Sequence, residues 1–218
     1  MKKEINLLKK YPKSKKDLNK KKINKKRCQL IARKFDKRFF DGSRDTGYGG
    51  FSYNPKFWSN VVKDLIKFYK LDKTKSVLDI GCAKGFTLVD MRKQIPKIKI
   101  RGIDISNYAI KNSHKKVKKY LDVGCCSKLP YKDNSFDLVL AINTIHNLGK
   151  RKCSKAIQEI NRVSKKNSFI VVYAYKNKIE KKRMFEWNLT AKTIMSVSNW
   201  KKFFKDNNYK GNYFWFTP

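Results

Sequence analysis

The stretch Val77–Phe86, with the sequence VLDIGCAKGF, constrains the fold more than any other part of the chain. An apolar run that ends in an acid and opens into a glycine-punctuated turn is typical of the first βα unit of a nucleotide-binding sheet. A second apolar run, IRGIDI, ends near Asp104, twenty-five residues after Asp79. An acid at that point can accept both hydrogen bonds of a ribose diol. The two runs together predict a nucleoside-binding site.

The order of apolar runs along the chain predicts the fold class. Strands are expected at residues 76–80, 98–105, 120–123, 136–142 and 168–175, and helices at residues 57–69, 85–94, 106–118 and 152–163. Strands that are apolar along their whole length are typical of a parallel sheet covered on both faces. We therefore predict an α/β, Rossmann-like, doubly wound and mostly parallel sheet with helices on both faces.

The N-terminal fifth of the chain differs in composition from the rest. Residues 1–40 hold 17 Lys and Arg against 3 acids. We expect residues 1–26 to be mobile or weakly helical, and residues 28–40 to form a helix that docks on a core. The predicted organisation is a basic, partly disordered or helical N-terminal extension over residues 1–40. Residues 41–218 form one domain, in which residues 178–193 and 198–205 are expected to be helical and residues 211–216 a last strand.

The formal net charge of +37 raises the question of nucleic acid. Such a charge would bind phosphate polymers through counterion release. However, the chain has 45 Lys against 9 Arg, and Arg is the usual reader of phosphates and base edges. No RNA-binding signature such as an RRM or KH motif is present. A nucleic-acid partner is therefore open but disfavoured, and most lysines are expected to be solvated surface groups.

Cysteine usage and hydropathy bear on the compartment. The chain has five Cys and two His, without CxxC spacing or a metal-ligand pattern, so no metal site is predicted. No apolar run approaches the roughly 20 residues that span a bilayer, and no apolar segment follows the basic start. We expect a cytoplasmic protein with reduced thiols and no membrane span. The sequence does not predict its oligomeric state.

The chemistry of the glycine turn favours a cationic ligand. The pattern Asp79-x-Gly81-x-Ala83-x-Gly85 differs from the GxGxxG turn that holds a pyrophosphate, because an acid precedes the first glycine. That acid would repel a pyrophosphate and attract a cation. No GKS or GKT follows, which excludes a P-loop. S-adenosylmethionine, with an ammonium and a sulfonium group, fits this electrostatic demand.

The chain resembles the class I S-adenosylmethionine-dependent methyltransferases of the broad small-molecule type. Val77–Phe86 resembles their first motif, and residues 101–106 resemble their acidic second-strand end. Residues 129–140, LPYKDNSFDLVL, resemble the LPFxDxSFDxV signature, and Glu159–Val163 matches an ExxRV helix. These motifs appear in the family's order over residues 76–175. Flanking segments around Gly47–Gly50, Asn143–Leu148 and Trp187–Thr190 resemble a narrower bacterial subset whose substrate is uncertain.

The resemblance implies roles for individual residues. The residues implied in donor binding are Asp79, Gly81, Cys82, Gly85, Asp104, Ile105, Cys125, Cys126 and Asn143. Asp79 would lie near the ammonium of the donor, Asp104 would accept from the ribose, and Ile105 would lie against the adenine. Many relatives carry an acid for the adenine amino group where Cys125 stands. This departure removes one carboxylate contact.

The acceptor side is less constrained by the sequence. The Gly- and Tyr-rich segment 41–55 is predicted to form a lid or substrate-contacting loop through Tyr48, Gly49, Gly50, Phe51 and Tyr53. His146 follows the fourth expected strand at the edge where such sheets bind substrates, so it is a candidate general base. The alternative is that His146 only orders its loop.

Three functions follow from these observations. The first is methyl transfer to an oxygen or nitrogen of a small-molecule acceptor, either a metabolite or a surface-glycan precursor. The second is an RNA or DNA methyltransferase that uses the lysine-rich surface, although the expected fourth strand ends in AINT and not in the (D/N/S)PP(Y/F) motif of base methylation. The third is a non-catalytic binding protein on a methyltransferase fold.

Overall fold

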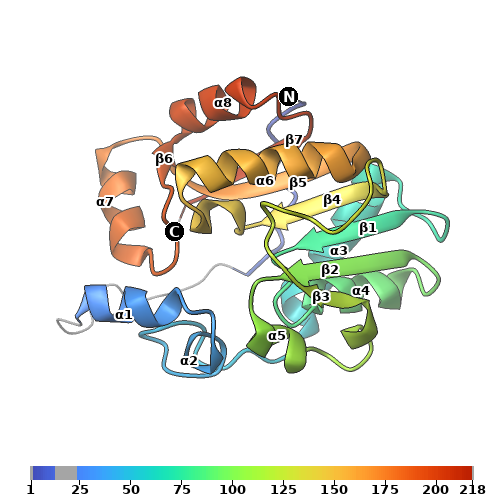
Figure 1. Cartoon of the computed structure of the whole chain (residues 1–218), viewed down its shortest axis with the longest axis horizontal. Helices are drawn as coiled ribbons and strands as arrows, with labels where there is room; N and C mark the ends of the chain where they lie inside the picture. Colours follow the sequence, from blue (N-terminus) through green and yellow to red (C-terminus); the bar gives the residue numbers. More distant parts are fainter. Residues whose placement is uncertain (1, 13–23, 218) are drawn as a thin grey trace.

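A computed structural model of the chain describes residues 2–12 and 24–217. The strands are β1 (Ser76–Ile80), β2 (Lys99–Asp104), β3 (Leu121–Val123), β4 (Phe136–Ile142), β5 (Ser164–Tyr175), β6 (Met195–Ser196) and β7 (Asn212–Phe216). They form one sheet in the order β3-β2-β1-β4-β5-β6, with β7 also paired to β5 (Figure 1). Each of these strand pairs is parallel. The predicted Rossmann-like, doubly wound sheet is confirmed.

Helices cover both faces of the sheet. They are α1 (Lys25–Ala32), α2 (Lys37–Phe40), α3 (Pro55–Tyr69), α4 (Phe86–Gln94), α5 (Asn107–Lys111), α6 (Lys150–Val163), α7 (Lys178–Trp187) and α8 (Val197–Asp206), with short 3₁₀ turns at η1 (Lys118–Tyr120) and η2 (Ile145–Asn147). One apolar core joins the sheet to α6 and α8, and a second joins it to α3 and α4. Across the described ranges, none of the helices has the length and apolar character needed to cross a bilayer.

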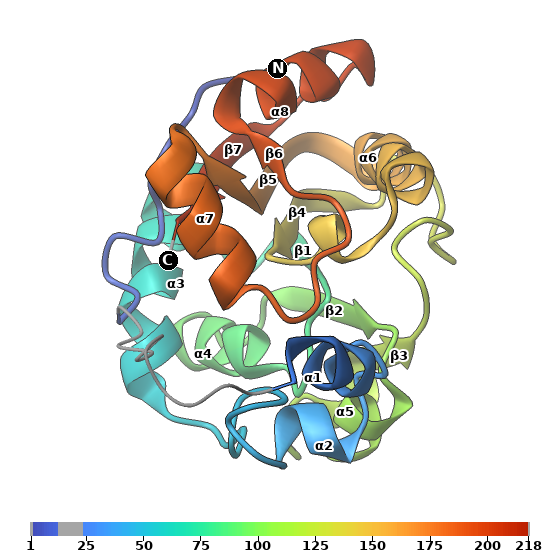
Figure 2. The same ribbon diagram turned by 90° about the vertical axis from the view of Figure 1, so that its left-hand side faces the viewer.

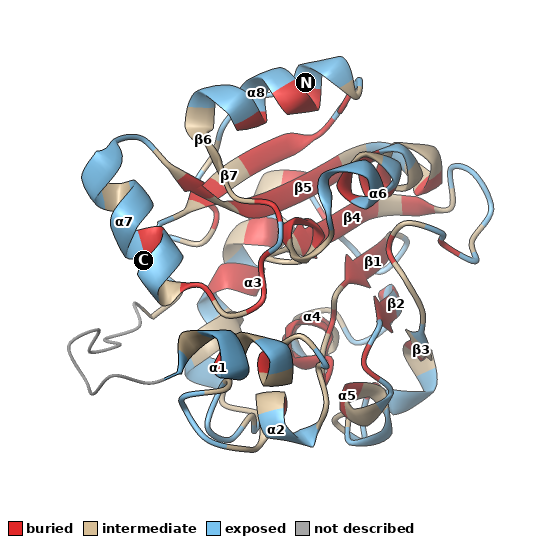
Figure 3. Ribbon diagram, turned by 60° about the vertical axis from the view of Figure 1, so that its left-hand side comes forward, coloured by how far each residue is buried: buried red, intermediate tan, exposed pale blue. Residues whose placement is uncertain are grey.

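The burial of the central strands explains why they are apolar along their whole length. In β1, Leu78 and Ile80 belong to the core under α6 and α8, whereas Val77 belongs to the core under α3 and α4. In β5, Ile170 and Val171 divide between the two cores in the same way. Because successive side chains point to opposite faces, a strand with two covered faces is mostly apolar, and the buried exception in β1 is Asp79 near its carboxyl end. The middle of the sheet is accordingly buried in Figure 3.

The first described residues extend the sheet beyond β7. Lys2 N donates to Gly211 O at 3.0 Å and Ile5 N to Tyr213 O at 3.0 Å, and Glu4 forms a parallel bridge with Tyr213. These bonds satisfy the otherwise open backbone edge of β7. The expectation of a mobile or weakly helical start is therefore wrong for residues 2–12, which are extended or turned. Residues 13–23 lie outside the described part of the chain.

The helix expected at residues 28–40 is broken into α1 and α2. Phe35 between them has a φ of 49°, which no α-helix accommodates, and the Asp36 side chain caps the second helix by accepting from Arg38 N. The α1 helix docks through side chains: Gln29 Nε2 donates to Asn188 O at 3.2 Å, and Arg33 donates to Ala191 O at 3.3 Å. Figure 2 shows α1 beside the loop that follows α7. The described parts of the basic extension, residues 2–12 and 24–40, therefore form part of the folded structure.

Candidate active site

A cleft of about 2410 Å³ lies at the carboxyl end of the sheet, between the strands, the segment around α1 and α2, and the region of α7. Ordinary small-ligand pockets measure about 300–1,000 Å³, so the cleft has room for two such ligands. Asp79, Gly81, Cys82, Asp104, Ile105, Cys125, Cys126 and Asn143 of the predicted donor site all line it. Gly85 does not line the cleft.

The turn after β1, residues 81–85, forms one wall and is called the donor turn below. Gly81 has a φ of 74°, and a Cβ there would lie 2.2 Å from Thr144 Oγ1. Gly85 has a φ of 80° and begins α4 without a side-chain cap. Ala83, where many relatives have glycine, adopts a φ of 51°. Gly81 is therefore needed both for its conformation and for the close approach of the Thr144 side chain.

Asp104 ties the donor turn to the next strand end. Its Oδ2 accepts from Ala83 N at 2.8 Å and its Oδ1 from Ser106 N at 2.8 Å. Burial raises the pKa of Asp104, and these two backbone hydrogen bonds act against the rise. Each carboxylate oxygen keeps a further lone pair on a side chain that lines the cleft. Asp104 is thus oriented to accept the hydroxyls of a ribose.

Asp79 is the second buried acid of the cleft. Burial raises its pKa to about 7, the nearby Asp104 adds to the rise, and a hydrogen bond from Thr87 opposes it. A cation that binds beside such an acid stabilises its ionised form and lowers its raised pKa. The arrangement suits the ammonium of the donor's methionine part.

Cys125 and Cys126 follow β3 and also line the cleft. Cys125 Sγ is 3.1 Å from Ser127 Oγ. A hydrogen bond from Cys126 is the main cause that lowers the pKa of Cys125 to about 5. Ile105, which is 56% exposed, lines the same part of the cleft. A thiol able to ionise therefore stands where many relatives place a carboxylate.

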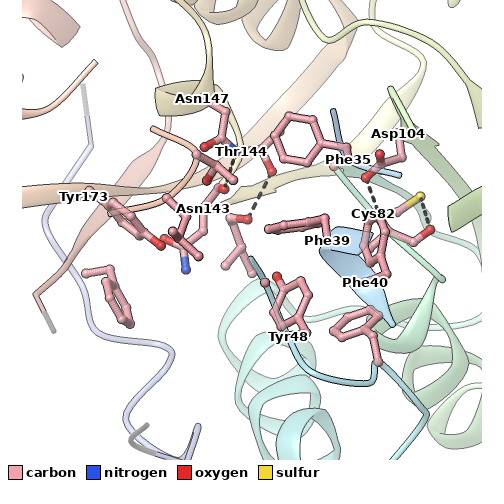
Figure 4. Close-up of a pocket in the computed structure, with 18 of the residues that line it drawn as sticks. Phe35, Phe39, Phe40, Tyr48, Cys82, Asp104, Asn143, Thr144, Asn147 and Tyr173 are labelled. Carbon is pink, nitrogen blue, oxygen red and sulfur yellow. Dashed lines mark hydrogen bonds between the residues drawn. The ribbon is translucent and has the colours of Figure 1, made fainter. Parts of the chain in front are cut away.

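The end of β4 provides polar groups that sequence reasoning largely missed. Asn143 has a φ of 54°, and Asn147 Nδ2 donates to Asn143 O at 3.3 Å. The side-chain oxygens of both residues are buried and have no hydrogen-bond partner. The sequence predicts only Asn143 as a site residue. Asn147 lies beside it because of the 3₁₀ turn η2, which the sequence does not indicate. Figure 4 shows both near Thr144 and Tyr173.

The segment of residues 35–51, called the cap below, closes the opposite side. Tyr48, Gly50 and Phe51 line the cleft as predicted, together with Phe39 and Phe40. Figure 4 shows Phe39 and Tyr48 across the pocket from Asn143. Gly49 is not among the lining residues. Phe51 packs on Phe86 with ring centroids 4.8 Å apart, and this contact joins the cap to α4.

Tyr53 and His146 lie outside the cleft, contrary to the predictions. Tyr53 points to α4, where its hydroxyl donates to Asp90 Oδ1 at 2.5 Å and accepts from Lys93. His146 is 1% exposed, stacks on Tyr173 at 4.0 Å, and accepts from Tyr173 N through Nδ1 at 3.1 Å. Burial lowers the pKa of His146 to about 3. The buried imidazole of His146 orders its loop through these contacts and does not face the cleft, which favours the alternative stated above.

The site residues fit S-adenosylmethionine. The donor turn lines the cleft through Gly81, Cys82 and Ala83, the two buried acids match a ribose and an ammonium, and a large free volume remains beyond them. When bound, this donor supplies an electrophilic methyl group on a sulfonium. Within residues 2–12 and 24–217, no group of three or more His, Cys, Asp or Glu side chains is placed to hold a metal ion.

Comparisons with known proteins agree with this site. A family model described as a methyltransferase domain matches residues 71–208. Norajmaline N-methyltransferase from Rauvolfia serpentina is 36% identical over 125 residues, which cover 54% of this chain and 40% of the relative's length. The chain thus spans well under two thirds of that relative.

Solved structures give the same fold. The YcgJ protein from Bacillus subtilis matches with a TM-score of 0.56 at 21% identity and covers 67% of this chain and 66% of its own. An S-adenosylmethionine-dependent methyltransferase from Aquifex aeolicus matches with a TM-score of 0.51 at 19% identity, covering 85% of this chain and 88% of its own. With the family match over most of the sheet, these findings show that the chain belongs to the class I S-adenosylmethionine-dependent methyltransferase family.

Proposed function

We propose that the chain transfers a methyl group from S-adenosylmethionine to an oxygen or nitrogen of a small-molecule acceptor. The observation that carries this proposal is the meeting of the donor turn, Asp79 and Asp104 with a large cleft at one edge of the sheet. Methyl transfer needs the two reactants in line, and much of the catalysis comes from proximity and orientation. The name of norajmaline N-methyltransferase, which specifies nitrogen of a small molecule, supports this class of acceptor.

Titration calorimetry with S-adenosylmethionine tests the donor site. Asp104→Ala should weaken binding by about tenfold or more, because the variant loses the ribose contact and two backbone hydrogen bonds. Asp122→Ala is the matched control, since that carboxylate lies on the neighbouring strand β3 and does not line the cleft. Equal binding by wild type and Asp104→Ala would reject the ribose assignment.

A nucleic-acid substrate is the second candidate, favoured by the lysines at the rim of the cleft. Eight lysines line it, and all but Lys25 are exposed. Affinity for a homopolymer RNA should then fall steeply with salt. Truncation of the first 27 residues is a poor test, because it also removes the segment that pairs with β7. Replacing the exposed rim residues Lys152, Lys176 and Lys182 by glutamine keeps that pairing and should weaken RNA binding, and a flat salt response of the wild type would reject this candidate.

The third candidate, a binding protein without catalysis, makes a different prediction. Such a protein would bind the donor and show no methyl transfer to any component of a metabolite extract. Incubation of the full chain with methyl-labelled donor and that extract separates the two cases, because labelled product appears only with catalysis.

A further inference from the structure

Aromatic side chains dominate the wall of the cleft. Of the 29 Phe, Tyr and Trp residues in the chain, 15 line it. They come from both sides: Phe39 and Tyr48 belong to the cap, whereas Tyr173 and Trp187 belong to β5 and α7. Flat apolar faces on two sides match a ligand with rings of its own.

Two buried side-chain oxygens at the wall of the cleft lack a hydrogen-bond partner. They belong to Asn143 and Asn147. Thr144 is occupied, because its hydroxyl donates to Ile80 O at 2.9 Å. A buried acceptor left unpaired costs free energy, which a ligand N–H could recover once these side chains adjust around it. The interior therefore suits a hydrogen-bond donor.

Among the described residues, no histidine lines the cleft as a general base for the acceptor, and Cys125 belongs to the predicted donor site. His146 is shut behind Tyr173, and His114 does not line the cleft. The lining carboxylates are Asp79 and Asp104, which belong to the donor site, and three exposed acids at the rim. An alcohol must lose its proton to become a good nucleophile, whereas a neutral amine already carries a lone pair.

We propose that the acceptor is a ring-bearing amine, held between Tyr48 and Tyr173 with its N–H directed at the amide oxygens of Asn143 and Asn147. This assignment rests on the proposed methyl transfer and specifies its substrate class. The nitrogen lone pair bonds to the methyl carbon while the carbon–sulfur bond breaks and its electron pair stays on sulfur. The positive charge moves to nitrogen, and an N–H proton then leaves to water.

The electrostatics of the site agree with this chemistry. Ring faces and amide oxygens are both electronegative, so they stabilise the charge that develops on nitrogen. They would repel a carboxylate, the other acceptor that needs no base.

Matched probes test the assignment. Phenethylamine, tryptamine and tetrahydro-β-carboline present amines on one, two and three rings. Tryptophol and indole-3-propionate replace the amine of tryptamine by a hydroxyl and a carboxylate, and ethanolamine removes the ring. Binding is measured by calorimetry to the full chain saturated with S-adenosylhomocysteine, and methylated products are identified by mass spectrometry with labelled donor. At least one ring amine should bind and be N-methylated, and its oxygen counterpart should bind about tenfold more weakly.

Two variants test where the ring amine binds. Tyr48→Leu and Asn147→Leu should each weaken the binding of the ring amine by about fivefold or more. The affinity for the donor should stay within about twofold of the wild-type value. Phe68→Leu is the control, because Phe68 is an aromatic residue of α3 outside the cleft. Absence of saturable binding by all three ring amines, equal binding of tryptophol, or unchanged affinity in both variants would overturn the assignment. Donor binding is measured in the same samples, so loss of donor binding by wild type would instead reject the proposed function.

Discussion

Lys84 Nζ lies 2.7 Å from Asp41 Oδ2 and 2.8 Å from Phe51 O, so a buried lysine of the donor turn holds the cap in place. Asp41 also accepts from Tyr108 at 2.8 Å and from Phe51 N at 2.9 Å. The cap that carries Tyr48 is thus fixed to both strand ends that form the donor site. Donor binding and cap position are expected to depend on one another.

Lys84→Met should destabilise the protein by about 2–4 kcal/mol, because it leaves the Asp41 carboxylate without its buried partner. Lys10→Met is the matched control: Lys10 pairs with Asp64 at 2.7 Å on the surface, and its loss should cost less than about 1 kcal/mol. Urea unfolding measures both. Hydrogen exchange should increase in residues 41–51 of Lys84→Met alone; equal exchange in the two variants would show that Lys84 does not hold the cap.

Donor affinity should rise with pH through Asp79. Its pKa of about 7 in the folded protein leaves the carboxyl half protonated near neutrality, and the donor's ammonium favours the ionised form. Between pH 6 and 7 the affinity should increase several-fold, with a limit of about tenfold per pH unit for one group. Calorimetry across this range measures the rise, and Asp79→Asn should bind weakly with no pH dependence. A wild-type affinity independent of pH would contradict the raised pKa.

His146→Gln should affect folding and leave the pH profile of catalysis unchanged. The folded pKa of about 3 lies below the unfolded value of 6.5, so the unfolded chain binds more protons between them. The His146 contribution to stability is therefore present above pH 6.5 and is lost as the pH falls towards 3. The variant should lose about 1–3 kcal/mol at pH 7, since a flexible amide replaces the buried ring that stacks on Tyr173 and holds the hydrogen bond from Tyr173 N. If the folded variant lost a limb of the pH–rate profile near pH 6–7, the result would support His146 as a general base.

Asp79 and His146 act on stability with opposite signs. Asp79 has a raised folded pKa, so the folded protein binds the extra proton and stability falls as the pH rises from about 4 to 7. Urea unfolding of Asp79→Asn should therefore show a steeper gain in stability with pH than wild type over that range. A shallower gain would mean that Asp79 is ionised in the folded protein.

Removal of residues 1–8 should expose the edge of β7. The loss of the pairs made by Lys2 and Ile5 leaves backbone donors and acceptors open, and buried Leu7 is lost as well. Open strand edges promote association, so light scattering should detect larger species and thermal unfolding should shift to lower temperature. Lys9→Ala/Lys10→Ala, which removes charge and keeps the strand, is the control. A truncated protein that is monodisperse and equally stable would show that the edge needs no cover.

The sequence predicts those parts of the fold that depend on local pattern. β1 and β4 match the expected residue ranges because their two-sided burial makes the whole strand apolar. Most of the predicted donor residues line the cleft because a turn and the ends of neighbouring strands bring them to one edge of the sheet, and their role in donor binding stays a prediction. Residues 2–5 were missed because their pairing partner lies some two hundred residues away, and composition alone gives no sign of a strand.

The acceptor side was harder to predict for a physical reason. Whether Tyr53 or Tyr48 enters the cleft depends on how the cap turns over α4, and the two residues look alike in sequence. His146 lies within the 3₁₀ turn η2, which places its ring against Tyr173, so a residue at the expected edge of the sheet does not face the cleft. The sequence does not indicate that Lys84 is buried, since its residue type does not distinguish it from the other 44 lysines of the chain.

The pairing of residues 2–5 with β7 also sets the order in which the protein can fold. Asn212 Nδ2 donates to Lys3 O at 3.1 Å across a separation of 209 residues, so this contact closes one of the longest loops in the chain. Such contacts form late because loop closure is entropically costly. The segment that starts there continues to Tyr11, which packs on Trp58 at 5.1 Å and lines the cleft. A chain emerging from the ribosome can therefore assemble its donor turn early, but completes the wall of the cleft only after β7 has been made.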